Sequence, residues 1–345
     1  MNEIKINIPL GSNFIFTQYF TDNQNEYLVW LDSTNKLIFF NLEKSKADYI
    51  IRLVNFNPKW NYYSIISRDS VMIISNLQNR IFIVNNEGKV IGDWKLSTKL
   101  NNKYSLFAQV DNPIYFINHK FYCSSIRNDI RLTNQQSFKE YYDSPTNIIL
   151  AISSDTLKPI KQFGQFPESY YKDKIFNFYD TTPSKTFNLN DKIVLSFAKD
   201  HFVYIYNLNG EFISKKSSKS SYIDYFNEFD SSKIYDFLYL RSYIEEEPAY
   251  LRIIYDQYQN LYYRLVKHRN QVNEKVELNI TDKNYQNFSL IVFDENLELQ
   301  DEIILNSDEF YLPGLIPTKK GILIPNSKKS NDSLFYGGIY KVKLK

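Results

Sequence analysis

Short runs in which apolar and polar residues alternate follow one another from end to end of the chain, and clusters of Asn, Asp, Gly and Ser separate them. A two-residue period is that of a half-buried β-strand, whereas long runs with the 3.6-residue period of a helix are scarce. The clearest repeated unit is a strand, a tight turn and a second strand, as in RIFIVNNEGKVIGDWKL from Arg80 and HFVYIYNLNGEFISKK from His201. Similar hairpins begin at Lys36, Asn147 and Phe288. The pattern predicts an all-β fold.

Two more strands can be placed ahead of each hairpin, and four antiparallel strands make one blade of a β-propeller. The six predicted blades span 13–54, 61–96, 113–164, 185–216, 249–305 and 311–344. The last blade has only three strands of its own, so we expect Glu3–Pro9 to pair with it as the fourth. Such a pairing closes the ring and leaves no open sheet edge. Residues 1–345 are therefore predicted to form a single six-bladed domain.

A pair of β-sandwiches is the alternative fold, because it would also have many short strands. It does not require the two ends of the chain to meet. Pairing of Glu3–Pro9 with the C-terminal strands therefore distinguishes the two folds.

Composition narrows the classes of partner. Phe, Trp and Tyr make up 17% of the residues, which suits pleated strands. The formal net charge is +2, with acids and bases interspersed, so neither nucleic acid nor an anionic membrane surface is an expected partner. The single cysteine, Cys123, excludes an internal disulfide and a multi-cysteine zinc site. No apolar run approaches the roughly 20 residues that cross a bilayer.

Function is expected on one face of the predicted propeller. With the strands of a blade lettered A to D in chain order, the B-to-C connections and those from D to the next A emerge on the same face. They include every long loop, at 97–112, 126–146, 165–184, 217–248 and 268–287. Long loops on a rigid scaffold often carry function.

Aromatic residues lie beside charged ones in these long loops. We select Tyr170, Tyr171, Tyr225 and Phe226 as candidates for contact with a protein, a peptide or a glycan, because exposed rings provide contact area and their neighbours provide hydrogen bonds. The alternative is that the rings fold back and are buried over the central channel. A short helix is expected within Tyr222–Glu247.

The most distinctive stretch is YDQYQNLYYRLVKH, which begins at Tyr255. On its second predicted strand Tyr262, Arg264 and His268 share one face. A guanidinium in an apolar strand needs acidic or carbonyl partners, so Arg264 either latches a neighbouring blade or contacts a ligand. All three residues are candidates for ligand binding.

The sequence offers little for metal or catalytic chemistry. Glu245, Glu246 and Glu247 precede Pro248 at the entry to an innermost strand, where a carboxylate could bind a divalent cation; a solvated turn is the alternative. No other cofactor is expected. Because no Gly-x-Ser-x-Gly elbow occurs, we assign no catalytic residue. A metal-dependent hydrolase or lyase with its site in the central channel is the alternative to a binding or scaffold role.

Three stretches carry a family resemblance: YDQYQNLYYRLVKH, SLIVFDENLELQDEIIL from Ser289, and FGQFPESYY from Phe163. They resemble an uncharacterised family of six-bladed, TolB-like or NHL-like β-propeller lipoproteins from Bacteroidetes, which has no established activity. The resemblance implies an exported protein, in the periplasm or at the cell surface, tethered through a lipidated N-terminal cysteine.

Met1–Leu10 shows neither such a cysteine nor a signal peptide. We therefore expect an extracytoplasmic, lipid-anchored protein if an export signal has been removed, and a cytoplasmic one if the sequence is full length. The leading expectation is a binding or scaffold propeller that recognises a protein, peptide or glycan through its long-loop face.

Overall fold

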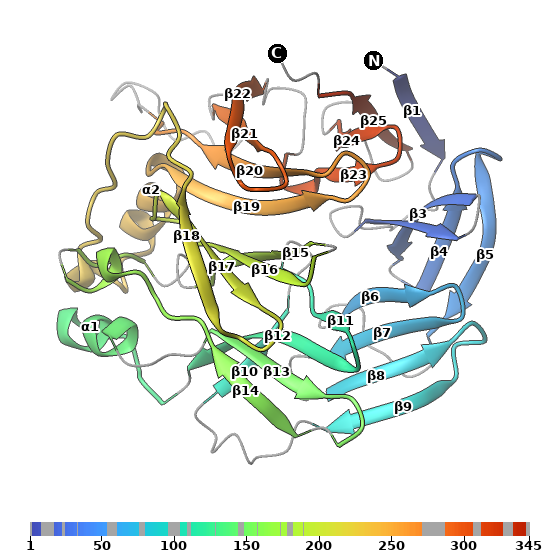
Figure 1. The fold of residues 1–345 in the computed structure, drawn as a ribbon, viewed down its shortest axis with the longest axis horizontal. Helices are drawn as coiled ribbons and strands as arrows, with labels where there is room; N and C mark the ends of the chain where they lie inside the picture. Colours follow the sequence, from blue (N-terminus) through green and yellow to red (C-terminus); the bar gives the residue numbers. More distant parts are fainter. Residues whose placement is uncertain are drawn as a thin grey trace. The chain divides into compact units, whose positions relative to one another are not determined.

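The computed structural model describes residues 2–7, 17–22, 25–32, 34–53, 61–75, 80–95, 104–108, 112–127, 129–143, 148–156, 158–172, 174–177, 182–188, 190–270, 287–305, 312–326 and 334–342. They form six antiparallel sheets, each with a path of four strands, which are the blades of a β-propeller (Figure 1). The predicted six-bladed fold is confirmed. The chain divides into two compact units, and each is described by itself below.

The first unit contains the described residues of 1–126, 149–161 and 314–342. Four blades belong to it, apart from the last residues of two strands. Its strands are β1 (Asn2–Asn7), β2 (Gln18–Asp22), β3 (Asn25–Leu31), β4 (Lys36–Asn41), β5 (Lys46–Arg52), β6 (Asn61–Ser67), β7 (Ser70–Ser75), β8 (Arg80–Asn85), β9 (Val90–Lys95), β10 (Tyr104–Phe107), β11 (Tyr115–Ile117), β12 (Lys120–Arg127), β13 (Ile149–Ser153), β14 (Pro159–Phe163), β23 (Ile316–Thr318), β24 (Gly321–Pro325) and β25 (Leu334–Tyr340).

The two ends of the chain share a blade, whose strand order is β1-β25-β24-β23. Strand β1 pairs antiparallel with β25, with Glu3 opposite Gly338 and Ile6 opposite Phe335. This is the contact that the propeller requires and the pair of sandwiches does not. The predicted closing strand is confirmed.

The core of the first unit lies between neighbouring blades. Val29 and Phe39 pack with Val71 and Ile73 of the next blade, whereas Trp30, one residue further along β3, joins a cluster with the blade of β24. Both faces of an inner strand are therefore covered, which explains the nearly continuous apolar runs of β3 and β7. Outermost strands such as β9 alternate exposed and half-buried residues, because only one face is covered.

The second unit contains the described residues of 127–148 and 162–313. It comprises two blades and the helical turns of the long loops. Its elements are α1 (Gln135–Asp143), η3 (Glu168–Tyr170), β15 (Ser184–Phe187), β16 (Lys192–Ser196), β17 (Phe202–Asn207), β18 (Phe212–Ser217), η5 (Ser231–Lys233), α2 (Phe237–Glu246), β19 (Ala249–Asp256), β20 (Leu261–Lys267), β21 (Phe288–Phe293) and β22 (Leu299–Leu305), followed by η6 (Leu312–Gly314) where the two units meet along the chain.

Helix α2 confirms the short helix expected within Tyr222–Glu247. Helix α1 was not expected, although Phe138, Tyr141 and Tyr142 have helical spacing and are all buried. With nine and ten residues, the α-helices of the described chain are too short to cross a membrane. Because α1 forms at Gln135–Asp143, the prediction of a loop over 126–146 is wrong for those residues.

Three strand boundaries also differ from prediction. The loop predicted at 97–112 contains β10, which pairs with β12, so this blade has a fifth strand. The strand predicted from Tyr311 is shorter, because η6 precedes β23. In the first blade β2 begins at Gln18, and the first half of the strand predicted over Asn13–Phe20 lies outside the described residues.

Candidate interaction site

The long loops of the second unit fold onto one another through aromatic rings. Phe138 of α1 packs against Phe229, with ring centroids 6.0 Å apart, and Tyr142 of the same helix lies 5.3 Å from Tyr170. Phe229 also packs against Tyr243 of α2 at 5.2 Å. These loops are therefore a packed layer with a fixed shape.

Two of the four aromatic candidates are inside this layer. Tyr170 is fully buried, and its hydroxyl accepts a hydrogen bond from the Lys199 backbone N–H at 3.0 Å. Phe226 is buried and stacks on His201 with centroids 5.0 Å apart. Tyr171 is half-buried, whereas Tyr225 is 56% exposed. Tyr225 is thus the only one of the four with a largely exposed ring.

Arg264 of β20 is fully buried and reaches into the neighbouring blade of the second unit. Its Nε donates to Ser196 Oγ of β16 at 2.8 Å, and its Nη2 donates to the carbonyls of Phe197 and Asp200 at 3.1 and 2.7 Å. The carbonyl and hydroxyl of Ser218 accept from Nη1. Burial lowers the pKa of the guanidinium to about 10. Of the two alternatives for Arg264, an interblade latch or contact with a ligand, these contacts are those of the latch.

Tyr262, the second candidate on this strand, is also buried. Its ring lies 4.8 Å from that of Tyr255, the residue opposite it on β19. The turn between these strands is capped by Asp256, whose Oδ1 accepts from the Tyr258 backbone N–H at 2.9 Å. The distinctive YDQYQNLYYR stretch therefore builds a hairpin and its packing.

His268 lies at the end of a polar chain beneath the loop surface. Its Nε2 lies 2.9 Å from Ser289 Oγ, which donates to Glu302 at 2.5 Å. Burial lowers the pKa of His268, and the Glu302 carboxylate opposes that shift. The half-exposed ring of Tyr222 stacks on the imidazole, with centroids 4.4 Å apart and planes 18° apart.

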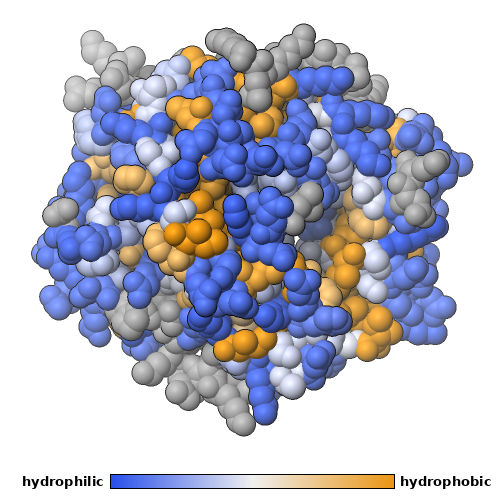
Figure 2. Space-filling model, in the orientation of Figure 1, coloured by the Kyte–Doolittle hydropathy of each residue, from blue (hydrophilic) through white to orange (hydrophobic). Residues whose placement is uncertain are grey.

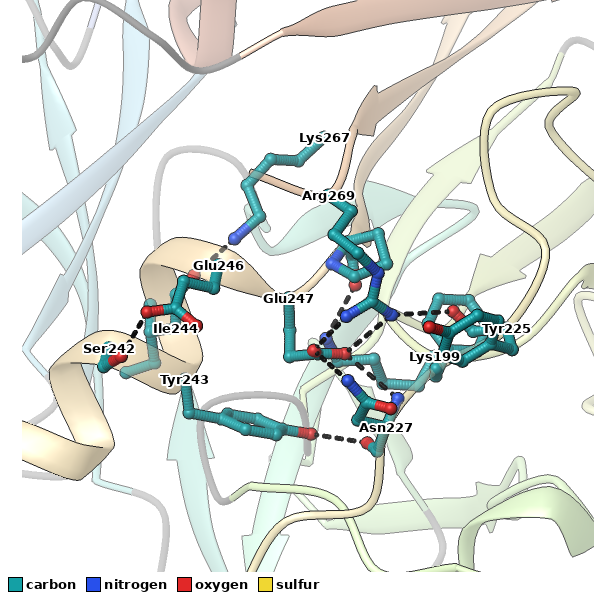
Figure 3. A network of polar contacts seen from close by, with 12 residues as sticks. Lys199, Tyr225, Asn227, Ser242, Tyr243, Ile244, Glu246, Glu247, Lys267 and Arg269 are labelled. Carbon is teal, nitrogen blue, oxygen red and sulfur yellow. Dashed lines mark hydrogen bonds and ion pairs between the residues drawn. The ribbon is translucent and has the colours of Figure 1, made fainter. Parts of the chain in front are cut away.

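The three adjacent glutamates are engaged by three different side chains, and Figure 3 shows the contacts of Glu246 and Glu247. Glu245 pairs with Arg241 at 2.8 Å, and Glu246 accepts a hydrogen bond from Ser242. The buried Glu247 pairs with Arg269 at 2.5 Å. Within the part of the chain that the structure describes, no three His, Cys, Asp or Glu side chains gather as a metal site would need.

Glu247 connects the C-terminal end of α2 to the loop before it. Its carboxylate accepts from the backbone and side-chain N–H groups of Asn227 at 3.0 and 2.7 Å (Figure 3). Burial alone would raise the pKa of Glu247, but these hydrogen bonds and the Arg269 guanidinium lower it below its ordinary value. Arg269 in turn lies 4.6 Å from the centroid of the Tyr225 ring.

The α2 tip, defined as Tyr235, Phe237 and Leu238, is the most exposed apolar group of the described loops. Their side chains are 72%, 71% and 71% exposed. Figure 2 shows apolar residues (orange) in separate patches on a mainly hydrophilic face. The α2 tip thus places three large exposed apolar side chains within four residues.

The backbone beneath the α2 tip is held firmly. Asp236 caps α2 by accepting from the N–H groups of Leu238 and Tyr239 at 3.0 and 3.1 Å. The Tyr239 hydroxyl accepts from the Asp230 N–H at 2.9 Å, and its ring packs against Phe229. The helix thus presents the tip on a fixed support.

Sequence reasoning did not single out the α2 tip or Arg269. Tyr239 and Tyr243 are four residues apart on the packed side of α2, and Phe237, Arg241 and Ile244 lie on the other side. This helical spacing is the signal that could have found Phe237, whereas nothing in the sequence pattern links Arg269 to Glu247.

Solved structures that resemble this chain include one with a high TM-score. The crystal structure of a member of the DUF4221 family from Bacteroides vulgatus ATCC 8482 superposes with a TM-score of 0.82, 14% identity, and coverage of 100% of this chain and 98% of that one. Virginiamycin B lyase from Staphylococcus aureus gives 0.46 at 10% identity, covering 97% and 98%, and BamB from Moraxella catarrhalis gives 0.36 at 7%, covering 95% and 70%.

No curated protein matches the sequence. The family described as Domain of unknown function (DUF4221) matches residues 5–304, which is most of the chain. The propeller fold of the solved family member agrees with that match. The protein belongs to the DUF4221 family.

Proposed function

We propose that this chain is a binding propeller that engages a protein partner through the α2 tip. The observation that carries the proposal is the exposure of Tyr235, Phe237 and Leu238, at 71–72%, on a capped and packed helix. Isolated exposed apolar residues are ordinary, but a contiguous group of them is typical of an interaction site. Aromatic anchors on a rigid support lose little conformational entropy on binding.

The contacts of Arg264 and Glu247 support a binding role over a metal-dependent hydrolase or lyase, because both side chains are already engaged within the protein. Arg264 uses its donors on the neighbouring blade, and Glu247 is buried against Arg269 and Asn227. A cation at Glu247 would have to displace an ion pair and two hydrogen bonds. The α2 tip needs no such rearrangement to bind.

An extracytoplasmic, lipid-anchored location is part of the proposal. It rests on the resemblance to lipoproteins from Bacteroidetes, and the solved relative also comes from a Bacteroides species. Detergent-phase partition of the protein from its native host tests the anchor. Recovery in the aqueous phase would contradict it.

Photo-crosslinking in the native host tests the binding function. p-Benzoylphenylalanine replaces Phe237 in one variant and, as a matched control, Phe212 in another. Phe212 is also an exposed aromatic residue, at 56%, but it lies on the outermost strand β18. We expect a protein adduct of defined mass from position 237 and none from position 212. Equal labelling from both positions, or none from 237, would overturn the proposal.

A further inference from the structure

We infer that the protein segment bound at the α2 tip is cationic, with apolar side chains for the tip and Lys or Arg side chains for the exposed carboxylates of residues 222–247. This inference rests on the proposed function and adds the chemistry of the partner. It is carried by the charge and the ion pairing of residues 222–247.

Residues 222–247 are acidic although the chain as a whole is nearly neutral. They include seven carboxylates and two cationic side chains, whereas the whole chain has a formal charge of +2. Both cations are paired within the segment, Arg241 with Glu245 at 2.8 Å and Lys233 with Asp230 at 3.6 Å. The segment therefore has no cation left for an acidic partner.

Asp224 and Glu228 are exposed carboxylates of this segment that a partner can reach. Both are exposed, and among the described residues neither forms an ion pair or a side-chain hydrogen bond. An exposed carboxylate remains hydrated and gains from a cation that approaches during binding. Charge complementarity therefore favours Lys or Arg at these positions of the partner.

Tyr222 and Tyr225 flank Asp224 and add a second attraction for cations. Their rings are 42% and 56% exposed, and the face of a tyrosine ring attracts ammonium and guanidinium groups. The surface already shows this preference, because the Arg269 guanidinium lies 4.6 Å from the centre of the Tyr225 ring. Apolar anchors, carboxylates and electron-rich rings together fit a basic amphipathic segment.

Two other occupants are less well matched to this charge. A bilayer could accept the Phe237 and Leu238 side chains, but anionic lipid would repel the carboxylates. A second copy of the chain would have to bring cations to the same acidic surface. Both occupants are separate outcomes of the test below.

The test measures binding of two synthetic probes to the full chain by fluorescence anisotropy. One probe is an amphipathic helical peptide of Leu and Lys, and the other has Glu in place of Lys. We expect the Lys peptide to bind roughly ten-fold more tightly. The pair Asp224→Asn and Glu228→Gln should weaken it about five-fold. The control pair Glu43→Gln and Glu295→Gln, two exposed turn residues, removes the same charge and should change nothing.

Equal affinity for the two peptides, or an equal loss in the control pair, would overturn the cationic partner. Recovery of the chain on phosphatidylglycerol vesicles, or a doubled mass in solution that Phe237→Ser abolishes, would also overturn it. The proposed function fails separately, when the crosslink from position 237 is absent. If the crosslink from position 237 forms but the two peptides bind equally well, the binding function stands and only the cationic character of the partner is contradicted.

Discussion

The guanidinium carbon of Arg264 lies 3.4 Å from the centroid of the Tyr250 ring, and both side chains are buried. Tyr250 belongs to β19 and Arg264 to β20, so the stack lies within one blade while the guanidinium donors reach the next. The Tyr250 hydroxyl accepts from the Ser220 N–H at 3.0 Å, where the chain enters the long loop. One buried cation thus fixes two blades and the start of the loop that carries α2.

Replacement of this cation should be strongly destabilising. Arg264→Met leaves the carbonyls of Phe197 and Asp200 without their donor, and we expect a loss of about 3 kcal/mol in the free energy of unfolding. Denaturant titration measures it. The control Arg80→Met removes an exposed pair with Asp93 and should cost less than about 1 kcal/mol. Similar losses in the two variants would contradict the latch.

Glu247→Gln should loosen the C-terminal end of α2. The variant weakens the pair with Arg269, and we expect a cost of about 1–3 kcal/mol with faster hydrogen exchange in α2. Because the pKa of Glu247 is lowered in the folded state, its stabilisation is present above its ordinary pKa of 4.5 and is lost as the pH falls through the folded value. Glu245→Gln, which affects only the exposed pair with Arg241, is the control. Unchanged exchange in Glu247→Gln would contradict this role.

Mild acid should destabilise the protein through two histidines. Burial lowers the pKa of both His201 and His268 below 6.5, so the folded state favours the neutral rings. Their stabilisation is complete above pH 6.5 and is lost as the pH falls through the folded pKa values. The melting temperature should therefore drop between pH 7.5 and about pH 5.5.

The matched variants separate these histidines from the rest of the chain. His201→Gln with His268→Gln should flatten the pH dependence, whereas His119→Asn, in the turn after β11, should keep it. A pH dependence that survives the double variant would mean that other groups cause it.

Deletion of residues 1–7 should expose a sheet edge. Strand β1 is the edge partner of β25, so its loss leaves the backbone groups of β25 unpaired. We expect a lower melting temperature and aggregation, with rescue by a synthetic peptide of residues 1–10. An unchanged melting temperature without the peptide would contradict the role of β1.

A single domain over 1–345 stays a prediction, and calorimetry tests it. A closed propeller should unfold in one transition, with equal calorimetric and van't Hoff enthalpies. Two resolved transitions would mean that the two compact units unfold independently.

The blades could be predicted because their signal is local. Val29 and Trp30 face different neighbouring blades, and this two-sided burial gives the apolar runs that reveal inner strands. The closing strand followed from counting, since the last blade lacked one. Helix α1 was not predicted because its three aromatic residues stand in a short, mainly polar segment, and such a composition is also typical of a surface loop.

The site could be predicted only in part, because exposure depends on contacts between distant residues. Tyr170 is buried under rings of α1, about thirty residues earlier in the chain, and no local pattern distinguishes it from Tyr225. Arg264 was recognised as a residue that needs partners, but the carbonyls it uses are 46 to 67 residues away in the sequence. The choice of residues 222–247 as a site stays a prediction, and which of its side chains are exposed follows from the fold.

The most direct test of the central claim compares the size of the complex that the protein forms in extracts of its native host, by native electrophoresis. The double variant Phe237→Ser and Leu238→Ser removes most of the α2 tip from a surface where neither side chain supports the fold. We predict that it migrates as the free chain while Phe212→Ser migrates with its partner like the wild type. A complex that persists in the double variant would contradict the claim that the α2 tip binds the partner.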